Sequence, residues 1–349
     1  MYLHGGYQQY CCSVLYVIGV RLAFMRLRKR QKMILSQISL YGHKSRRILT
    51  GFGYNDHLCK NNIKKEHQVI QYFGTIADDL CLNTLVSAQE AQDLNIEIHQ
   101  SLDSTNTRLR HILESMDLTS SEYGLVQLVC SDEQTAGRGR MQRKWLSPPG
   151  QNTYTSFAFH FPGDLDLSGL SLAVGLSLRR VLVQQTGLDI HVKWPNDVVT
   201  SQGKLAGILI EALHQDGAWL VIIGIGVNVN MQPSNDTSTQ VAQSVTSLAA
   251  ETGSTVNRAR IIMGLYRTLS GDMLRFLHDG WAGFAQEWKT VDRLAGQTVN
   301  VFEGGFSEHT TPWQGVAQGV DHLGRLQVED TNGQIHAVLS GDVSVRLAF

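Results

Sequence analysis

The spacing of apolar residues changes near Thr290, and this change limits the folds open to the chain. Before Thr290, segments with helical spacing alternate with strand-like segments. After it, only short strand-like segments occur, separated by glycine or asparagine turns, and they span 299–302, 313–320, 325–329, 335–339 and 343–347. Such a succession is typical of a small all-β barrel. We therefore expect an α+β region followed by a small β-barrel.

Three helices are expected before Thr290. Asp103 or Ser104 can cap the first, Gly187 ends the second, and each has apolar residues at intervals of three and four. These apolar positions are Leu109, Ile112, Leu113 and Met116, then Leu170, Val174, Leu178 and Val181, and finally Ile261, Leu265, Leu269, Met273 and Phe276. One face of each helix is therefore expected to pack on a sheet.

Four strands are expected in the same region, at 123–130, 154–161, 206–213 and 219–229. Gln215-Asp216-Gly217 is a turn signal that joins the last two strands in a hairpin. Because hairpin strands pair antiparallel, we expect a central mixed or antiparallel sheet with flanking helices.

A cationic, glycine-containing segment lies between the first two of these strands. Gln134 to Trp145 contains two glycines, four positively charged side chains and a terminal indole. Glycine lets a backbone approach a ligand closely, arginine binds phosphate or carboxylate oxygens two at a time, and an indole can stack on a purine. On its own, the segment fits an anion-binding loop and a solvated basic loop equally well.

Four further motifs favour the anion-binding loop over the solvated basic loop. Asp103–Asn106 precedes the first helix, Lys193–Asp197 follows a short apolar run, and Gly203–Gly207 and Gly224–Asn230 come after it. In this order and at this spacing, together with the cationic segment, they resemble the biotin protein ligases over roughly Leu94 to Phe349. No single motif would suffice alone.

The resemblance implies three regions. Residues 94–289 would form the biotin- and ATP-binding catalytic domain, with a fold like that of the class II aminoacyl-tRNA synthetases. Residues 290–349 would form an SH3-like barrel, in agreement with the strand pattern. Residues 1–93 show no convincing winged helix-turn-helix, so a diverged DNA-binding domain, a disordered arm and a non-native extension all stay open there.

The reaction that the resemblance implies has two steps. Biotin and MgATP give biotinyl-5′-AMP and pyrophosphate, and the adenylate then acylates one lysine of the biotin carboxyl carrier domain of acetyl-CoA carboxylase. A carboxylate is a poor electrophile, so activation must precede attack by an amine. The enzyme would mainly hold two anions together and neutralise the developing charge. The resemblance therefore implies ATP, Mg²⁺ and biotin, with the carrier domain as protein partner.

Matching motifs assign roles to individual residues. Those expected at biotin are Ser104, Thr105, Asn106, Gln134, Gly137, Arg138, Gly139, Arg140, Lys204 and Gly207. Those expected at ATP or the adenylate are Arg138, Arg140, Arg143, Trp145, Asn196, Lys204 and Asn228. Those expected to be catalytic are Lys204, Arg138, Arg140, Lys193 and Asp197. Asn196 and Asp197 could position Mg²⁺ or the attacking amine, and no dedicated metal site is expected.

The chain departs from the family pattern at one place. Met141-Gln142 stands where the family has a basic residue and a third glycine. Glutamine adopts a positive φ less readily than glycine, so we expect this loop to close differently or more slowly. Retention of the adenylate is the property most affected, and an inactive binding paralogue stays open as an alternative.

The formal net charge of −1 conceals a basic segment from Arg21 to Lys65, in which Asp56 is the only acidic residue. Such a segment fits nucleic-acid binding or a solvated arm. The apolar run from Cys11 to Phe24 is shorter than the roughly 20 residues that span a bilayer, so no membrane association is expected. Five cysteines without paired spacing favour a reducing, cytoplasmic setting.

Two other functions share parts of this pattern. A lipoate or octanoate ligase would carry an Arg-Arg and Gly-Gly-Gly motif near a His-Asp pair, whereas His278-Asp279 falls on a late helix, so biotin is favoured. A biotin-operon repressor would need a DNA-binding domain, so DNA binding stays uncertain. Homodimers paired edge to edge occur in the family, and no feature of this sequence tests that expectation.

Overall fold

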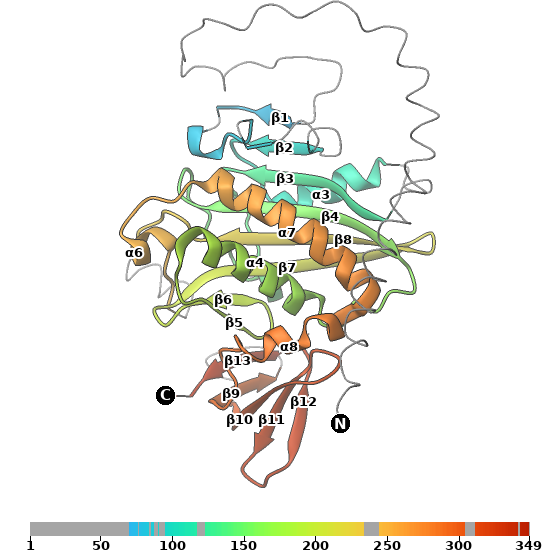
Figure 1. The fold of residues 1–349 in the computed structure, drawn as a ribbon, viewed down its shortest axis with the longest axis vertical. Helices are drawn as coiled ribbons and strands as arrows, with labels where there is room; N and C mark the ends of the chain where they lie inside the picture. Colours follow the sequence, from blue (N-terminus) through green and yellow to red (C-terminus); the bar gives the residue numbers. More distant parts are fainter. Residues whose placement is uncertain are drawn as a thin grey trace, which may run out of the picture. The chain divides into compact units, whose positions relative to one another are not determined.

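A computed structural model of the chain describes residues 70–348 except 76, 84, 87–89, 91–94, 117–122, 234–243, 304–310 and 341–342. The basic segment and most of the region considered for DNA binding lie outside these described residues. Two sheets organise the described part, one of eight strands and one of five (Figure 1). In the described part of the chain, no helix is both long and apolar enough to cross a membrane.

The large sheet is mixed, as expected, with the order β1-β2-β3-β4-β8-β7-β6-β5. β1 pairs with β2 and β2 with β3 in parallel, and all the other neighbours pair antiparallel. The sheet begins upstream of residue 94, because β1 is part of it. The strands are β1 (Ile70–Phe73), β2 (Ile96–His99), β3 (Gly124–Ser131), β4 (Thr153–Pro162), β5 (His191–Lys193), β6 (Asp197–Val199), β7 (Lys204–Gln215) and β8 (Ala218–Val227).

Helices cover both faces of this sheet. α4 and α7 cross one face side by side, and α3 packs on the other (Figure 1). The alternation of β4 divides its side chains accordingly: Phe157 and Phe159 join the larger core, and Ala158 joins the smaller core beneath α3. The helical elements are η2 (Asp78–Leu80), α3 (Thr105–Glu114), η3 (Arg140–Gln142), α4 (Leu170–Thr186), α6 (Leu248–Thr252), α7 (Arg258–Asp279), η4 (Gly280–Gly283) and α8 (Ala285–Trp288).

The three expected helices and the expected hairpin are confirmed as α3, α4, α7 and β7–β8. Gly187 ends α4 in the left-handed conformation at φ 71°, and its N–H donates to Val183 O at 2.8 Å. Asp216 and Gly217 turn the hairpin with φ angles of 52° and 77°. Asp-Gly is a preferred pair for a type I′ turn, which explains why the turn was readable from the sequence.

The C-terminal sheet is antiparallel in the order β12-β11-β10-β9-β13, and it confirms the expected small all-β region. Two indoles attach it to the α+β region. Trp194 Nε1 donates to Gly324 O at 3.0 Å and Trp281 Nε1 donates to Asp321 O at 3.1 Å. Its strands are β9 (Thr298–Glu303), β10 (Trp313–Val320), β11 (Leu326–Asp330), β12 (Ile335–Val338) and β13 (Val343–Leu347).

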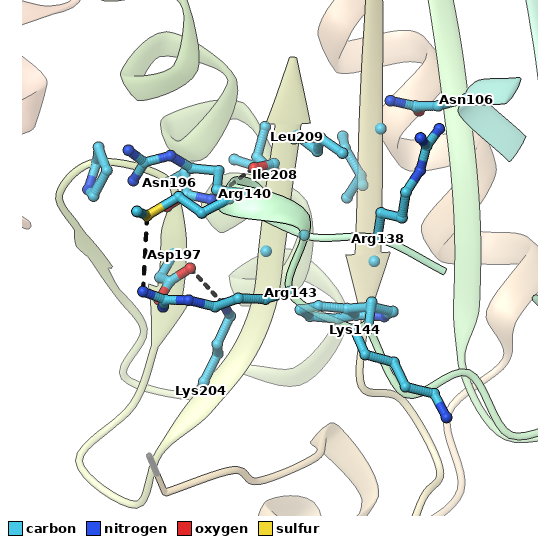
Figure 2. Close-up of a pocket in the computed structure, with 18 of the residues that line it drawn as sticks. Asn106, Arg138, Arg140, Arg143, Lys144, Asn196, Asp197, Lys204, Ile208 and Leu209 are labelled. Atoms are coloured by element: carbon cyan, nitrogen blue, oxygen red, sulfur yellow. Dashed lines mark hydrogen bonds and ion pairs between the residues drawn. The ribbon is translucent and has the colours of Figure 1, made fainter. Parts of the chain in front are cut away.

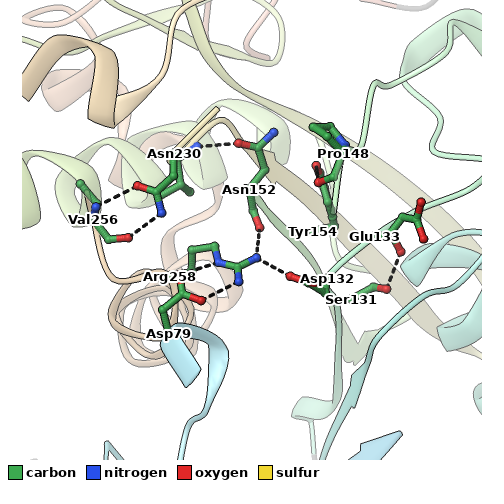
Figure 3. Close-up of polar contacts among 11 residues, drawn as sticks. Asp79, Ser131, Asp132, Glu133, Pro148, Asn152, Tyr154, Asn230, Val256 and Arg258 are labelled. Atoms are coloured by element: carbon green, nitrogen blue, oxygen red, sulfur yellow. Dashed lines mark hydrogen bonds and ion pairs between the residues drawn. The ribbon is translucent and has the colours of Figure 1, made fainter. Parts of the chain in front are cut away.

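A fully buried guanidinium holds four segments together at the start of α7 (Figure 3). Arg258, which is 0% exposed, donates to both carboxylate oxygens of Asp79 at 2.7 and 2.6 Å. It also donates to Asp132 at 2.5 Å and to Asn152 O at 3.2 Å. These residues belong to η2, the end of β3 and the start of β4, so one side chain fixes their separation.

A second ionic cluster links β2 to α3. Glu97 accepts hydrogen bonds from Arg108 at 2.8 and 2.9 Å and lies 2.8 Å from His99 Nε2. Burial raises the pKa of Glu97, but hydrogen bonds and charge from His99 and Arg108 outweigh burial and lower the pKa from 4.5 to about 2. The carboxylate of Glu97 therefore binds a proton more weakly in the folded state than in the unfolded chain.

We expect Glu97→Gln to destabilise the protein at neutral pH and to matter less in acid. Since the folded pKa is depressed, the stabilising contribution is complete above about pH 4.5 and is lost as the pH falls toward 2. The measurement is the difference in urea midpoint between wild type and variant at about pH 7 and about pH 3. Glu114→Gln, at an exposed position of α3, is the control, and an unchanged difference for Glu97→Gln would contradict the linkage.

Candidate functional site

One pocket brings together most of the residues that the motifs predicted (Figure 2). It is lined by segments from the start of α3, the cationic segment, the β5–β6 turn and strands β7 and β8, and β13 of the C-terminal sheet closes it. The predicted residues that line it are Ser104, Thr105, Asn106, Gln134, Arg138, Gly139, Arg140, Arg143, Trp145, Lys193, Asn196, Asp197, Lys204 and Gly207.

The first turn of α3 forms a polar end of the pocket. Ser104 occupies the N-cap, but its side chain makes no capping hydrogen bond. Gln134 supplies the acceptor instead, because its Oε1 receives Thr105 N–H at 2.9 Å and lies 3.1 Å from Thr105 Oγ1. Thr105 and Asn106 are 4% exposed. Gln134 thus binds the backbone at the start of α3, and Ser104 is among the residues that line the pocket.

The cationic segment is a β-hairpin, here called the flap (residues 137–145). Trp145 N–H donates to Gly137 O at 2.9 Å and Gly139 N–H donates to Arg143 O at 2.7 Å. Arg138 faces Lys144 across the hairpin and its Nη2 donates to Thr107 Oγ1 at 3.0 Å, which ties the flap to α3. The flap therefore covers the pocket as an ordered hairpin rather than as an irregular loop.

The tip of the flap is a strained turn. Arg143 N–H donates to Arg140 O at 3.2 Å, and both residues between them have positive φ, 56° for Met141 and 56° for Gln142. Two successive positive φ angles are the signature of a type I′ turn, which favours Asn-Gly or Asp-Gly. Each non-glycine residue there costs about 1–2 kcal/mol. Gln142 therefore adopts a positive φ although glutamine disfavours it, and the hairpin includes this conformational cost.

Trp145 lies flat against a floor of two glycines. Gly207 on β7 and Gly226 on β8 are cross-strand partners, and a Cβ on either would come within 2.9 or 2.6 Å of the indole. Lys204 Nζ sits 5.2 Å from the ring centroid, a cation–π arrangement. The indole nitrogen is buried against β8 without a hydrogen-bond partner among the described residues.

The β5–β6 turn and β7 contribute a charged pair. Lys204 Nζ lies 2.6 Å from Asp197 Oδ1, and both side chains are 14% exposed. Asp197 is the only carboxylate among the described residues that line the pocket. Burial lowers the pKa of Lys193, the positive charge of Lys204 lowers it further, and Asp197 opposes both. The opposite sides of the pocket in Figure 2 are thus an amide at Asn106 and an ammonium at Lys204.

Two predicted residues do not line the pocket. Gly137 lies at the base of the flap, where a Cβ would come within 2.8 Å of both Ser147 Oγ and Trp145 O. Asn228 is 5% exposed, and its Nδ2 donates to Lys204 O at 3.1 Å. Gly137 permits the hairpin to close and Asn228 holds the backbone at Lys204, so both support the pocket from behind.

Several pocket residues were missed by the sequence motifs. Tyr154 lies in a strand that reads as ordinary core, Gly226 was noted only within an apolar run, and Arg346 lies on the last strand of the C-terminal sheet. Burial lowers the pKa of Arg346, and the charge of Arg143 lowers it further. A lone arginine in a terminal strand carries no local signal, because only the packing of the C-terminal sheet brings it to the pocket.

The chain matches known proteins over the same segments. Residues 98–228 match the biotin/lipoate A/B protein ligase family, and residues 309–346 match the biotin protein ligase C-terminal domain. The bifunctional ligase/repressor BirA of Salmonella typhimurium is 31% identical over 261 residues, which cover 72% of this chain and 78% of that protein. The chain belongs to the biotin protein ligase family.

Other relatives agree with this family. The biotin–[acetyl-CoA-carboxylase] ligase of Mycobacterium tuberculosis is 30% identical over 222 residues, covering 62% of this chain and 77% of that protein. The structure of the biotin protein ligase from Aquifex aeolicus in complex with biotin and ATP superposes with a TM-score of 0.58 at 27% identity, covering 72% of this chain and 99% of that one. The match to the biotin protein ligase C-terminal domain favours biotin over lipoate.

We expect substitutions at Gln142 to change how often the flap of this biotin protein ligase family member opens. Gln142→Gly removes the left-handed strain, and Gln142→Val adds β-branching at a positive φ. The rate of trypsin cleavage after the flap arginines should fall in the first variant and rise in the second. Cleavage after Arg293, outside the flap, is the internal reference, and equal rates in both variants would show that the turn carries no strain.

Proposed function

We propose that this chain is an ATP-dependent biotin protein ligase that makes biotinyl-5′-AMP and transfers biotin to a lysine of a biotin carboxyl carrier protein. The observation that carries the proposal is a single pocket with a hydrogen-bonding end at α3 and a cationic end at the flap and Lys204. A ureido ring suits the first end, and a carboxylate beside a phosphate suits the second.

In the first step, a carboxylate oxygen of biotin bonds to the α-phosphorus of ATP, and the bond from that phosphorus to the bridging oxygen breaks to release pyrophosphate. Two anions must approach each other, which is unfavourable without nearby cations. Arg138, Arg140 and Lys204 supply them, and Arg143 extends the same positive field along the phosphates. Preorganised charge of this kind stabilises the transition state.

The base and the sugar of ATP need a platform of their own. Trp145 presents one face to the Gly207–Gly226 floor, which leaves the other face for stacking on adenine. Asn196 is fixed by its own hydrogen bond from Nδ2 to Ile208 O at 2.7 Å. The side-chain oxygen of Asn196 is therefore free to contact the nucleotide.

In the second step, the amine of the carrier lysine attacks the acyl carbon, an amide forms, and the bond from that carbon to the AMP oxygen breaks. Asp197 orients the incoming amine and receives its proton, while Lys193 and Lys204 hold the departing phosphate. Burial lowers the pKa of Lys193, and an anion beside this side chain stabilises its charged form.

Mg²⁺ enters as part of the ATP substrate. Among the described residues, no three histidine, cysteine, aspartate or glutamate side chains are placed to hold a metal ion together, and the one carboxylate at the pocket, Asp197, faces Lys204. Mg²⁺ is commonly held by one or two carboxylates together with substrate phosphates and waters. The pocket fits that mode, with Asp197 and Asn196 as the protein oxygens.

The partner and the division of the chain follow from the same proposal. Relatives named biotin–[acetyl-CoA-carboxylase] ligase support the carrier domain of that carboxylase as acceptor. Residues 94–289 would bind biotin and ATP, and residues 290–349 would complete the pocket with Arg346. The proposal includes a homodimer in which the large sheets of two copies pair edge to edge. DNA binding, named for the ligase/repressor relatives, would depend on residues outside those described.

We expect Lys204→Met to slow adenylate formation by about 100-fold, because it removes a positioned charge and keeps the length of the side chain. Biotin-dependent exchange of pyrophosphate into ATP measures this first step directly, and transfer of labelled biotin to a carrier domain measures both steps. Lys289→Met, at an exposed position, should leave both rates unchanged. Exchange at the wild-type rate in Lys204→Met would overturn the role of Lys204.

A further inference from the structure

A carboxylate behind the polar end of the pocket has no role in the proposed function. Glu211 belongs to β7 and lies behind the described residues that line the pocket. Its Oε2 accepts a hydrogen bond from Asn106 Nδ2 at 2.8 Å, and its Oε1 accepts one from Arg110 Nη2 at 3.1 Å. Asn106 and Arg110 are one turn apart on α3, so the same carboxylate receives both side chains.

The amide of Asn106 is held from its other end as well. Ser156 Oγ lies 2.6 Å from Asn106 Oδ1, and a Cβ at Gly224 would come within 2.4 Å of the same oxygen. Asn106 is 4% exposed and still borders the pocket. Its side chain is therefore enclosed by β4, β7 and β8, and the neighbouring groups determine its orientation.

Glu211 and Ser156 determine which way the NH₂ group and the carbonyl oxygen of the Asn106 amide point. An ionised carboxylate only accepts hydrogen bonds, whereas an amide carries a donor group and an acceptor group of nearly equal shape. Glu211 therefore requires the NH₂ group of Asn106 on its side, and the carbonyl oxygen must face Ser156. These two contacts use one N–H and one lone pair of the amide, and Asn106 is also among the residues that line the pocket.

We propose that Glu211 is a positioning residue that acts through Asn106 to fix the hydrogen-bonding polarity of the polar end of the pocket. Arg110 keeps the carboxylate in place by occupying its second oxygen. The fixed amide favours a head group that both donates and accepts hydrogen bonds, as the cyclic urea of biotin does. This inference rests on the proposed function, and it adds the element that selects the head group.

Glu211→Gln tests the proposal with little change in size. The new amide can donate as well as accept, so Asn106 is no longer held in one orientation. We expect the Kd for biotin, measured by calorimetry, to rise about tenfold, with the KM for ATP and the Tm close to wild type. A second ligand, 2-iminobiotin, has a guanidinium that only donates, and the ratio of its Kd to that of biotin should fall in the variant.

Two further variants separate positioning from folding. Arg110→Gln leaves the Asn106–Glu211 bond in place and should give a smaller change in the same direction. Glu287→Gln breaks another ion pair of similar exposure, 28% for Glu287 against 24% for Glu211, and should change neither Kd. Equal weakening of both ligands with a lower Tm would mean that Glu211 only supports the fold, and unchanged binding would also overturn the proposal. Failure of the wild type to bind biotin would instead refute the proposed function.

Discussion

The buried guanidinium of Arg258 is the constraint on which the position of the site depends. An uncompensated charge in a protein interior costs several kcal/mol, so Arg258 can be buried only where Asp79 and Asp132 reach it. Asp132 directly follows β3 and lies two residues before Gln134, which caps α3. The ion cluster thus sets where the polar end of the pocket begins, although none of its members borders the pocket.

The positively charged side chains that line the pocket repel one another. Seven arginine and lysine side chains line it, against one carboxylate, and like charges in a partly shielded site repel one another more strongly than in water. Burial and neighbouring cations lower the pKa of both Lys193 and Arg346. An anionic ligand offsets this repulsion, so the charges that line the pocket favour the carboxylate and phosphates of the proposed reaction.

The sequence predicted those parts of the molecule whose signals are local. Helical spacing identified α4 and α7, and the Asp216-Gly217 pair identified the β7–β8 hairpin. β1 and β2 were missed because parallel pairing depends on partners that are remote in the chain, with Ile96 opposite Leu128 on β3. The motifs likewise found the flap and Lys204. Arg346 and the floor formed by Gly226 went unassigned because only tertiary packing gives them a role.

Two type I′ turns among the described residues show how local preference and function can diverge. Asp216-Gly217 and Met141-Gln142 both have two positive φ angles, yet only the first pair suits them. The β7–β8 hairpin has only a structural role, and its Asp-Gly turn adopts the positive φ angles with little strain. In the proposed function, the flap admits biotin and ATP, encloses their adenylate and then releases AMP, so it has to open in every cycle. Strain at its tip raises the energy of the closed form and so shortens its lifetime, at the expense of retaining the intermediate. Under the proposed function, the positive φ of Gln142 shifts that balance toward opening.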